Sequence, residues 1–236
     1  NYDKVYYKIE KVEDYHLFKI KYNFINNPIE LNFLNYKIND QSEVSLRLDG
    51  KLNKDKSLYF KKIKFKNSND SIIIDDLALT NDFKISKIKS AIFNFTDSQN
   101  KKNIFKIKDN KKNYLIYGKT FNASKFIDDM IFDDSKNIDI FARDYDIKID
   151  LKEVFLHNDH ISYNLKGSLS SKDNDVINAN ITSQFNENEK IIFSIIRKNN
   201  QRVTTFFSDQ AKPFVRKFNF IKGFNNGSLD FYSVKS

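Results

Sequence analysis

Apolar and polar residues alternate along most of this chain. The most regular runs lie at 18–24, 44–48, 145–151, 161–169 and 177–185. A period of two residues turns every apolar side chain of a strand towards one face of a sheet and leaves the other face in water. This arrangement is typical of antiparallel sheets, since parallel sheets are usually apolar on both faces. Less regular apolar segments predict further strands at 4–10, 29–37, 57–66, 71–79, 84–96, 103–108, 112–118, 190–196, 202–207 and 228–234.

The apolar positions of the regular runs are the candidate lining of a groove. They are Phe18, Ile20, Tyr22, Phe24, Val44, Leu46, Leu48, Tyr145, Ile147, Ile149, Leu151, Ile161, Tyr163, Leu165, Leu169, Ile177, Ile181 and Phe185. A sheet that folds on itself into a barrel or sandwich would bury these side chains in a closed core. A sheet that curls into an open trough would instead offer them to a ligand. The alternation is the same in both cases and leaves both architectures open.

Short segments rich in Asn and Asp separate the expected strands, as at 67–70, 97–100 and 172–175. Asn and Asp tolerate the left-handed conformation of tight turns, so they take the place of Gly, of which the chain has only five. Strands and short turns in regular succession predict a meander. Between Phe60 and Ile63 the apolar positions shift by one residue, and this shift predicts a β-bulge.

Two segments, 122–130 and 208–218, break this rhythm and predict short amphipathic helices. Their apolar positions, spaced as on one face of a helix, are Ala123, Phe126, Ile127 and Met130 in the first segment and Ala211, Phe214, Val215 and Phe218 in the second. Each segment follows a strand that ends in Phe, and each has a capping side chain at its entry. We expect the last three apolar residues of each segment to cap the groove.

Together these patterns predict a mainly β fold, in which a long meandering antiparallel sheet is curled into a groove or a flattened barrel, with two short helices. Two such helices cannot cover the apolar face of so many strands, so apolar surface is left for a ligand or a partner. We expect residues 1–236 to form a single elongated β domain, with a sub-boundary near 98–102. Because the chain opens at Asn1 without an initiator Met, we interpret it as a fragment of a longer chain.

The composition supports a folded and basic protein. The chain contains 23 Phe and 12 Tyr, which is far more than a disordered segment carries. The formal net charge is +9, but the Lys residues are scattered along nearly every strand, opposite the apolar positions. We interpret them as a solvated face with a weak attraction to anionic headgroups. A nucleic-acid partner is not expected, because such proteins concentrate their basic residues in one patch or helix.

Few residues offer catalytic or metal chemistry. The chain has no Cys, so disulfides and thiolate metal sites are excluded. His157 and His160 flank an expected turn, and the acidic residues around 128–134 lack the spacing of a calcium loop. No nucleotide-binding or nucleophile motif occurs, and no apolar run is long enough for a membrane-spanning helix. We therefore expect no catalytic residues, no metal and no cofactor.

The C-terminal half, over about residues 114–234, resembles AsmA-like proteins of the YhdP type, which are related to TamB. The segment 205–218 reads T-F-F-S-D-Q-A-K-P-F-V-R-K-F, and 221–230 reads I-K-G-F-N-N-G-S-L-D. In that family a strand leads into Ser-Asp-x-Ala/Gly, an amphipathic helix with a central Leu-Leu-Arg-like step, and a Gly-Gly-containing turn into a strand. The segment 117–122, Y-G-K-T-F-N, is similar to an upstream Gly-x-Ser-Phe-Asp element of the family.

The resemblance implies a function in lipid transport. Such proteins are anchored in the bacterial inner membrane, project a curled β-groove through the periplasm, and are implicated in moving phospholipid towards the outer membrane. This chain would then be a non-enzymatic periplasmic segment that binds phospholipid acyl chains. Its partners would include the remainder of the parent chain, with an inner-membrane anchor. The alternatives are a β-rich structural or outer-membrane-assembly scaffold that binds a protein partner, and, third, an enzyme with two converging carboxylates.

Overall fold

The computed structural model describes residues 3–24, 29–38, 43–125, 141–157, 160–173, 175–198, 201–214 and 226–235. The chain is mainly β, as the alternation predicted. The described strands are β1 (Lys4–Val12), β2 (Tyr15–Phe24), β3 (Ile29–Leu31), β4 (Tyr36–Ile38), β5 (Val44–Asn53), β6 (Leu58–Asn67), β7 (Asp70–Leu79), β8 (Ile85–Thr96), β9 (Lys102–Asp109), β10 (Tyr114–Asn122), β11 (Tyr145–His157), β12 (His160–Lys172), β13 (Asp175–Gln184), β14 (Lys190–Lys198), β15 (Gln201–Ser208) and β16 (Leu229–Lys235).

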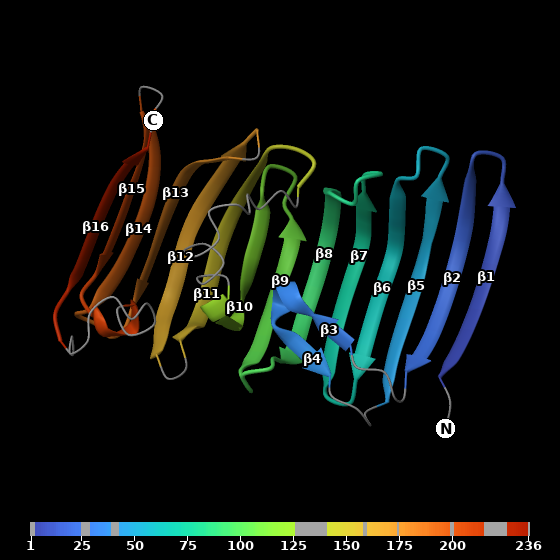
Figure 1. Cartoon of the computed structure of the whole chain (residues 1–236), viewed down its shortest axis with the longest axis horizontal. Coiled ribbons are helices and arrows are strands. Elements are labelled where there is room, and N and C mark those ends of the chain that lie inside the picture. The colour runs from blue at the N-terminus through green and yellow to red at the C-terminus, as the bar shows by residue number, and fades with distance from the viewer. Residues whose placement is uncertain are drawn as a thin grey trace. The chain divides into compact units, whose positions relative to one another are not determined.

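The chain divides into two compact units (Figure 1). Unit 1 comprises 1–109 and 138–143, and unit 2 comprises 110–137 and 144–236. In unit 1 the sheet order is β1-β2-β5-β6-β7-β8-β9, with β3 and β4 paired apart from it. In unit 2 the order is β10-β11-β12-β13-β14-β15-β16. The strand segments at 4–10, 57–66, 71–79 and 84–96, among others, are confirmed.

The register of unit 1 gathers its apolar side chains on one face, which we call the apolar face. Residues paired directly across antiparallel strands point to the same side of a sheet. One cross-strand row runs through Tyr7, Ile20, Leu48, Ile63, Ile74, Ala91 and Ile107. The next row runs through Val5, Tyr22, Leu46, Phe65, Ile72, Phe93 and Phe105. The alternation of each strand therefore agrees with that of its neighbours across the whole unit.

The expected β-bulge in β6 is confirmed at Lys61. Gly50 pairs with Phe60 but Asp49 pairs with Lys62, so Lys61 is the extra residue. The neighbouring strand β7 compensates at Asp76, which also lies outside the pairing and has a positive φ of 49°. The Tyr59 hydroxyl donates to the Asp76 carboxylate, and this hydrogen bond, with the Lys89 ion pair at 3.0 Å, lowers the pKa of Asp76.

A small hairpin covers one end of the apolar face. The expected strand at 29–37 is wrong in part, because β3 and β4 are separated by a 3-10 helix (Asn32–Leu34). Asn35 closes this turn in the left-handed conformation, with φ 51°, and its N–H donates to the Asn32 carbonyl at 3.1 Å. The hairpin places Tyr36, which is 1% exposed, edge-on to Phe65 at 5.8 Å and to Phe95 at 5.3 Å.

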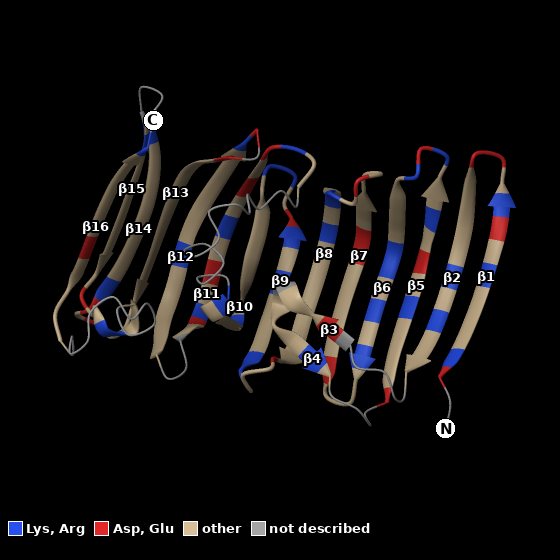
Figure 2. Ribbon diagram, viewed as in Figure 1, with Lys and Arg blue, Asp and Glu red and all other residues tan. Residues whose placement is uncertain are grey.

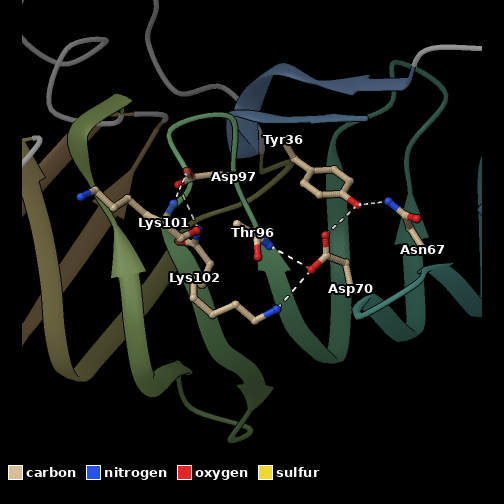
Figure 3. A network of polar contacts seen from close by, with 8 residues as sticks. Tyr36, Asn67, Asp70, Thr96, Asp97, Lys101 and Lys102 are labelled. Atoms are coloured by element: carbon tan, nitrogen blue, oxygen red, sulfur yellow. Dashed lines mark hydrogen bonds and ion pairs between the residues drawn. The ribbon is translucent and has the colours of Figure 1, made fainter. Parts of the chain in front are cut away.

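A polar network fixes this hairpin to the sheet (Figure 3). The Tyr36 hydroxyl donates to Asp70 Oδ2 at 3.2 Å and accepts a hydrogen bond from Asn67 Nδ2 at 3.4 Å. Asp70 Oδ1 accepts from the Thr96 N–H at 3.1 Å and from Lys102 Nζ at 3.2 Å. Burial is the main cause that raises the pKa of Tyr36, to about 12. The network satisfies the one polar atom that the buried ring brings into the core.

In unit 2 the expectation of a purely antiparallel sheet is wrong. β10 and β11 are parallel, with Tyr114 opposite Ile147 and Ile116 opposite Ile149, so the sheet is mixed. Parallel strands need a long crossover rather than a tight turn, and here residues 123–144 connect the two strands. The flattened barrel is also wrong. Among the described residues β1 pairs only with β2 and β16 only with β15, so the sheet does not close.

The two predicted helices are not supported. Within the described residues, helical backbone at these places covers only 124–125 and 212–214. Phe214 does pack edge-on against Phe206 of β15 at 4.7 Å, and Ala211 is 1% exposed. The remaining expected cap residues, Phe126, Ile127, Met130, Val215 and Phe218, lie outside the described residues.

Removal of the Tyr36 hydroxyl tests the network. We expect Tyr36→Phe to lower the free energy of unfolding at neutral pH by about 1 kcal/mol. The folded pKa of Tyr36 is raised from 10.0 to about 12, so its stabilising contribution is complete below pH 10 and is lost as pH rises towards 12. The difference in free energy of unfolding between wild type and Tyr36→Phe should therefore become smaller as the pH rises. Urea unfolding followed by circular dichroism at neutral pH and at about pH 11 measures both effects.

Tyr232→Phe is the control for that experiment, because Tyr232 is 65% exposed and should tolerate the change at neutral pH. If the difference in free energy of unfolding between wild type and Tyr36→Phe stayed constant with pH, the raised pKa of the Tyr36 hydroxyl would be contradicted.

A second prediction concerns Gly50, where the chain has no room for a side chain. A Cβ at this position would lie 2.3 Å from the Tyr59 carbonyl oxygen and 2.9 Å from Phe18 Cζ. Because Gly50 has no side chain, the rings of Phe18 and Phe60 pack against each other across β5, with their centroids 5.7 Å apart. We expect Gly50→Ala to lower the free energy of unfolding by about 2 kcal/mol. Ser45→Ala, on the other face of β5, is the matched control, and equal losses in urea unfolding would refute the steric explanation.

Candidate functional site

The apolar face of unit 1 is exposed at its β1 end. Val5, Tyr7 and Ile9 of β1 point to this face and are 54%, 72% and 61% exposed. Three aromatic or large aliphatic side chains so exposed on one strand are unusual on the surface of a folded domain. The apolar side chains beside them on β2 and β5 are half-buried. We call this region the open apolar strip, and it consists of Val5, Tyr7, Ile9, Phe18, Ile20, Tyr22, Leu46 and Leu48.

The exposure falls steadily along the sheet. In the row that begins with Val5, Tyr22 and Leu46 are half-buried, while Phe65, Ile72 and Phe93 are 6%, 5% and 7% exposed. Two features explain this gradient. Tyr36 of the β3–β4 hairpin packs on Phe65 of β6 and on Phe95 of β8. Among the described strands β1 is also the last of the sheet, and its Tyr6 on the other face is 57% exposed as well. The apolar face is therefore a covered core next to the hairpin and a partly exposed surface at β1, β2 and the middle of β5.

The open apolar strip has the chemistry of a surface for an apolar ligand. Neighbouring strands lie about 4.8 Å apart, so its three-strand row of Tyr7, Ile20 and Leu48 is about 10 Å long. This length accommodates part of an extended acyl chain. The row contains no charged side chain, and its one polar atom is a Tyr hydroxyl. Contacts along it would be non-directional and would select for apolar shape rather than for a functional group.

The structure brings together all seven candidate residues that the sequence placed in unit 1. Phe18, Ile20, Tyr22, Phe24, Val44, Leu46 and Leu48 share the apolar face, with Tyr22 opposite Leu46 and Ile20 opposite Leu48. Val44 is 1% exposed and belongs to the covered core. The sequence did not single out Val5, Tyr7 and Ile9, which are more exposed than any of these seven. The signal was the alternation within 4–10, where Tyr6 and Lys8 separate the three positions and Lys4 and Glu10 flank them.

The unit 2 candidates are buried to a similar degree. Ile147, Ile149 and Leu151 pair with Leu169, Gly167 and Leu165, and Ile181 pairs with Gly167 on the next strand. Leu151 is 4% exposed, and the other apolar residues of this group are half-buried. Tyr145, Ile177 and Phe185 are also half-buried, and Phe185 lies just beyond β13.

Alternation is interrupted in β12. Asn164 has a positive φ of 54°, and the pairing with β13 shifts between Tyr163 and Lys166. As a result Tyr163 is 40% exposed while its neighbour Ser162 is fully buried. Ile161 is half-buried. A bulge reverses the facing of the residues that precede it, so Tyr163 does not share the burial of Leu165 and Leu169.

The described residues offer little else for chemistry. In this part of the chain, no three His, Asp or Glu side chains come together as metal ligands, and no helix has the length and hydropathy that a bilayer crossing requires. The acidic residues around 128–134 lie outside the described ranges. The lowered pKa values of Asp55, Asp76 and Asp82 all arise first from hydrogen bonds donated by neighbouring hydroxyl groups, which are structural contacts.

Comparison with known proteins gives no relative: no family model, no curated protein and no solved structure matches this chain. The fold and the site must therefore be interpreted from their own geometry.

Two isoleucines on the same face test the gradient in exposure. Ile72 is 5% exposed and Ile9 is 61% exposed. We expect Ile72→Ala to lower the free energy of unfolding by about 3 kcal/mol and Ile9→Ala by less than about 1 kcal/mol. Urea unfolding of both variants measures the two losses, and each serves as the matched control for the other. Equal losses would mean that the β1 end of the face is covered in solution.

Proposed function

We propose that this chain binds phospholipid acyl chains along the open apolar strip and acts as a lipid-transfer segment in the periplasm. The observation that carries the proposal is the exposure of Val5, Tyr7 and Ile9 on the face where the rest of unit 1 builds its core. The resemblance of residues 114–234 to AsmA-like proteins agrees with this function and suggests the location between the inner and outer membranes.

The energetics of the strip suit transfer better than tight storage. Each buried methylene contributes about 0.8 kcal/mol, so an acyl chain that lies on the strip gains several kcal/mol from water exclusion. The strip is open on one side and has no polar group that would hold a ligand at one position. Neighbouring positions along the row therefore bind an acyl chain with similar free energies, and a lipid can move between them. No catalytic residue is needed for this activity.

A protein partner is the second candidate, and the edge of β1 favours it. Among the described residues β1 pairs with β2 alone, so its other edge presents free backbone donors and acceptors. A strand from another protein could pair there and cover Val5, Tyr7 and Ile9. The chain would then be a structural or assembly scaffold without a ligand.

Analysis of bound lipid distinguishes the two candidates. Protein purified in mild detergent from a bacterial host should retain phospholipid, which solvent extraction and mass spectrometry quantify per mole of protein. Tyr7→Asp with Ile9→Asp places two carboxylates on the strip and should lower the bound lipid on the order of tenfold, the effect of about 1.4 kcal/mol. Both side chains are exposed, so the variant should keep the circular dichroism spectrum of the wild type.

The matched control for this experiment is Tyr232→Asp with Val234→Asp on β16, where the side chains are 65% and 45% exposed. This pair should leave the bound lipid unchanged. Wild-type protein without lipid, or an equal loss in the control, would refute the proposal and favour the scaffold.

A further inference from the structure

The other face of the unit 1 sheet is strongly basic, and we call it the basic face; Figure 2 marks the positions of Lys and Arg along the strands. Four cross-strand rows form it, and the register fixes their members. Its twelve cationic residues are Lys4, Lys8, Lys19, Lys21, Arg47, Lys51, Lys62, Lys64, Lys66, Lys87, Lys106 and Lys108. Its three carboxylates are Glu10, Asp49 and Asp75.

A general excess of lysine does not explain this face. The polar face of unit 2 has three paired rows across its seven strands, which contain Lys148 and Lys166 against Asp146, Asp150 and Asp230. Lys119 and Lys152, which continue the alternation of β10 and β11, bring this face to four cations against three carboxylates. A composition rich in lysine would make both polar faces basic to a similar degree. The excess of positive charge is instead concentrated on one face of one unit.

Cations also lie directly opposite one another on this face. Lys21 pairs with Arg47, and Arg47 pairs with Lys64, so three positive side chains stand in line across β2, β5 and β6. Like charges at directly paired positions destabilise a sheet. None of the three forms an ion pair with a carboxylate among the described residues, unlike Lys8 with Glu10 at 3.4 Å and Lys62 with Asp75 at 3.3 Å. Among the described residues no carboxylate balances this row, which suggests that an external anion does so.

A shallow hollow of about 400 Å³ lies over the same strands. Its lining residues are Tyr6, Tyr7, Lys8, Lys19, Ile20, Lys21, Arg47, Leu48, Asp49 and Lys62. Seven of the ten belong to the basic face, and Tyr7, Ile20 and Leu48 are the residues between them in the sequence, so the hollow opens on the basic face. It brings five cations and one carboxylate around a space that can hold a phosphate-bearing group.

The chemistry of the face favours a membrane surface over a nucleic acid. Eleven of its twelve cations are Lys, whereas nucleic-acid recognition favours Arg, whose planar group binds phosphate and bases in a bidentate manner. Single strands also need free aromatic rings on which bases stack. Here Lys21 Nζ lies over the Tyr6 ring at 5.9 Å, and Lys51 Nζ lies over the Tyr15 and Tyr59 rings at 5.2 and 5.9 Å, so a base that stacked on these rings would compete with a lysine.

We propose that the basic face docks unit 1 on an anionic phospholipid bilayer. Side chains of one sheet face stand on a common side, so cations from four rows reach a charged lipid surface together, and each contributes to the attraction. The docking surface lies opposite the open apolar strip and goes beyond acyl-chain binding. It requires no lipid to be bound on the strip, so either proposal can fail without the other.

Vesicle sedimentation tests the docking surface. Purified protein should co-sediment with vesicles in which about a third of the lipid is phosphatidylglycerol and remain in solution with phosphatidylcholine alone. Binding should weaken sharply from about 0.1 M to about 1 M salt, as the Debye length falls from about 10 Å to about 3 Å. Lys21→Gln, Arg47→Gln and Lys64→Gln together should lower the partition coefficient about a hundredfold. Because the substitutions remove like-charge repulsion, the melting temperature should stay the same or rise.

The matched control carries Lys148→Gln, Lys152→Gln and Lys166→Gln, which remove the same charge from exposed positions of unit 2. It should lower the partition coefficient by less than about tenfold. Equal losses in the two triple variants, or equal binding to neutral and anionic vesicles, would overturn the proposal. Tighter binding to a single-stranded oligonucleotide than to anionic vesicles at the same salt concentration would overturn it in favour of a nucleic-acid partner.

Discussion

The cross-strand register of unit 1 is the constraint on which the rest of the molecule depends. Each strand alone is only amphipathic, with its apolar residues at every second position. The pairing of Ile20 with Leu48 and of Leu48 with Ile63 makes the apolar positions of successive strands coincide. A slip of one residue in any pair would exchange the faces and place lysines beside phenylalanines. The two faces exist as separate surfaces because every pair in the unit keeps this register, including the pairs around the bulge at Lys61.

Alternation predicted the strands of this protein well because it reports a local property, the facing of each side chain. It even located the bulge in β6, since an extra residue changes the parity within a short segment. Features that depend on distant pairing were not predicted. The parallel pair β10–β11 and the hairpin that covers Phe65 and Phe95 depend on which segments meet, and period two is the same for every partner.

The candidate site was also predicted only where it depends on local alternation. The sequence identified Ile20, Tyr22, Leu46 and Leu48 as residues of one apolar face, but not which part of that face is covered. Tyr36 covers part of that face, and the sequence predicted its segment, 29–37, as a single strand. The basic face was visible in the sequence only as scattered lysines. Its net charge became apparent once the register showed that Lys21, Arg47 and Lys64 stand in one line without a facing carboxylate.

The free edge of β1 has a consequence for how such a surface can be enlarged. A pocket has a volume fixed by its walls, whereas a sheet face grows by about 4.8 Å with every strand added at its edge. A further strand with the same alternation would lengthen each apolar row and each lysine row together, without any change to the strands already present. In this architecture the length of the surface available to a ligand increases with the number of strands.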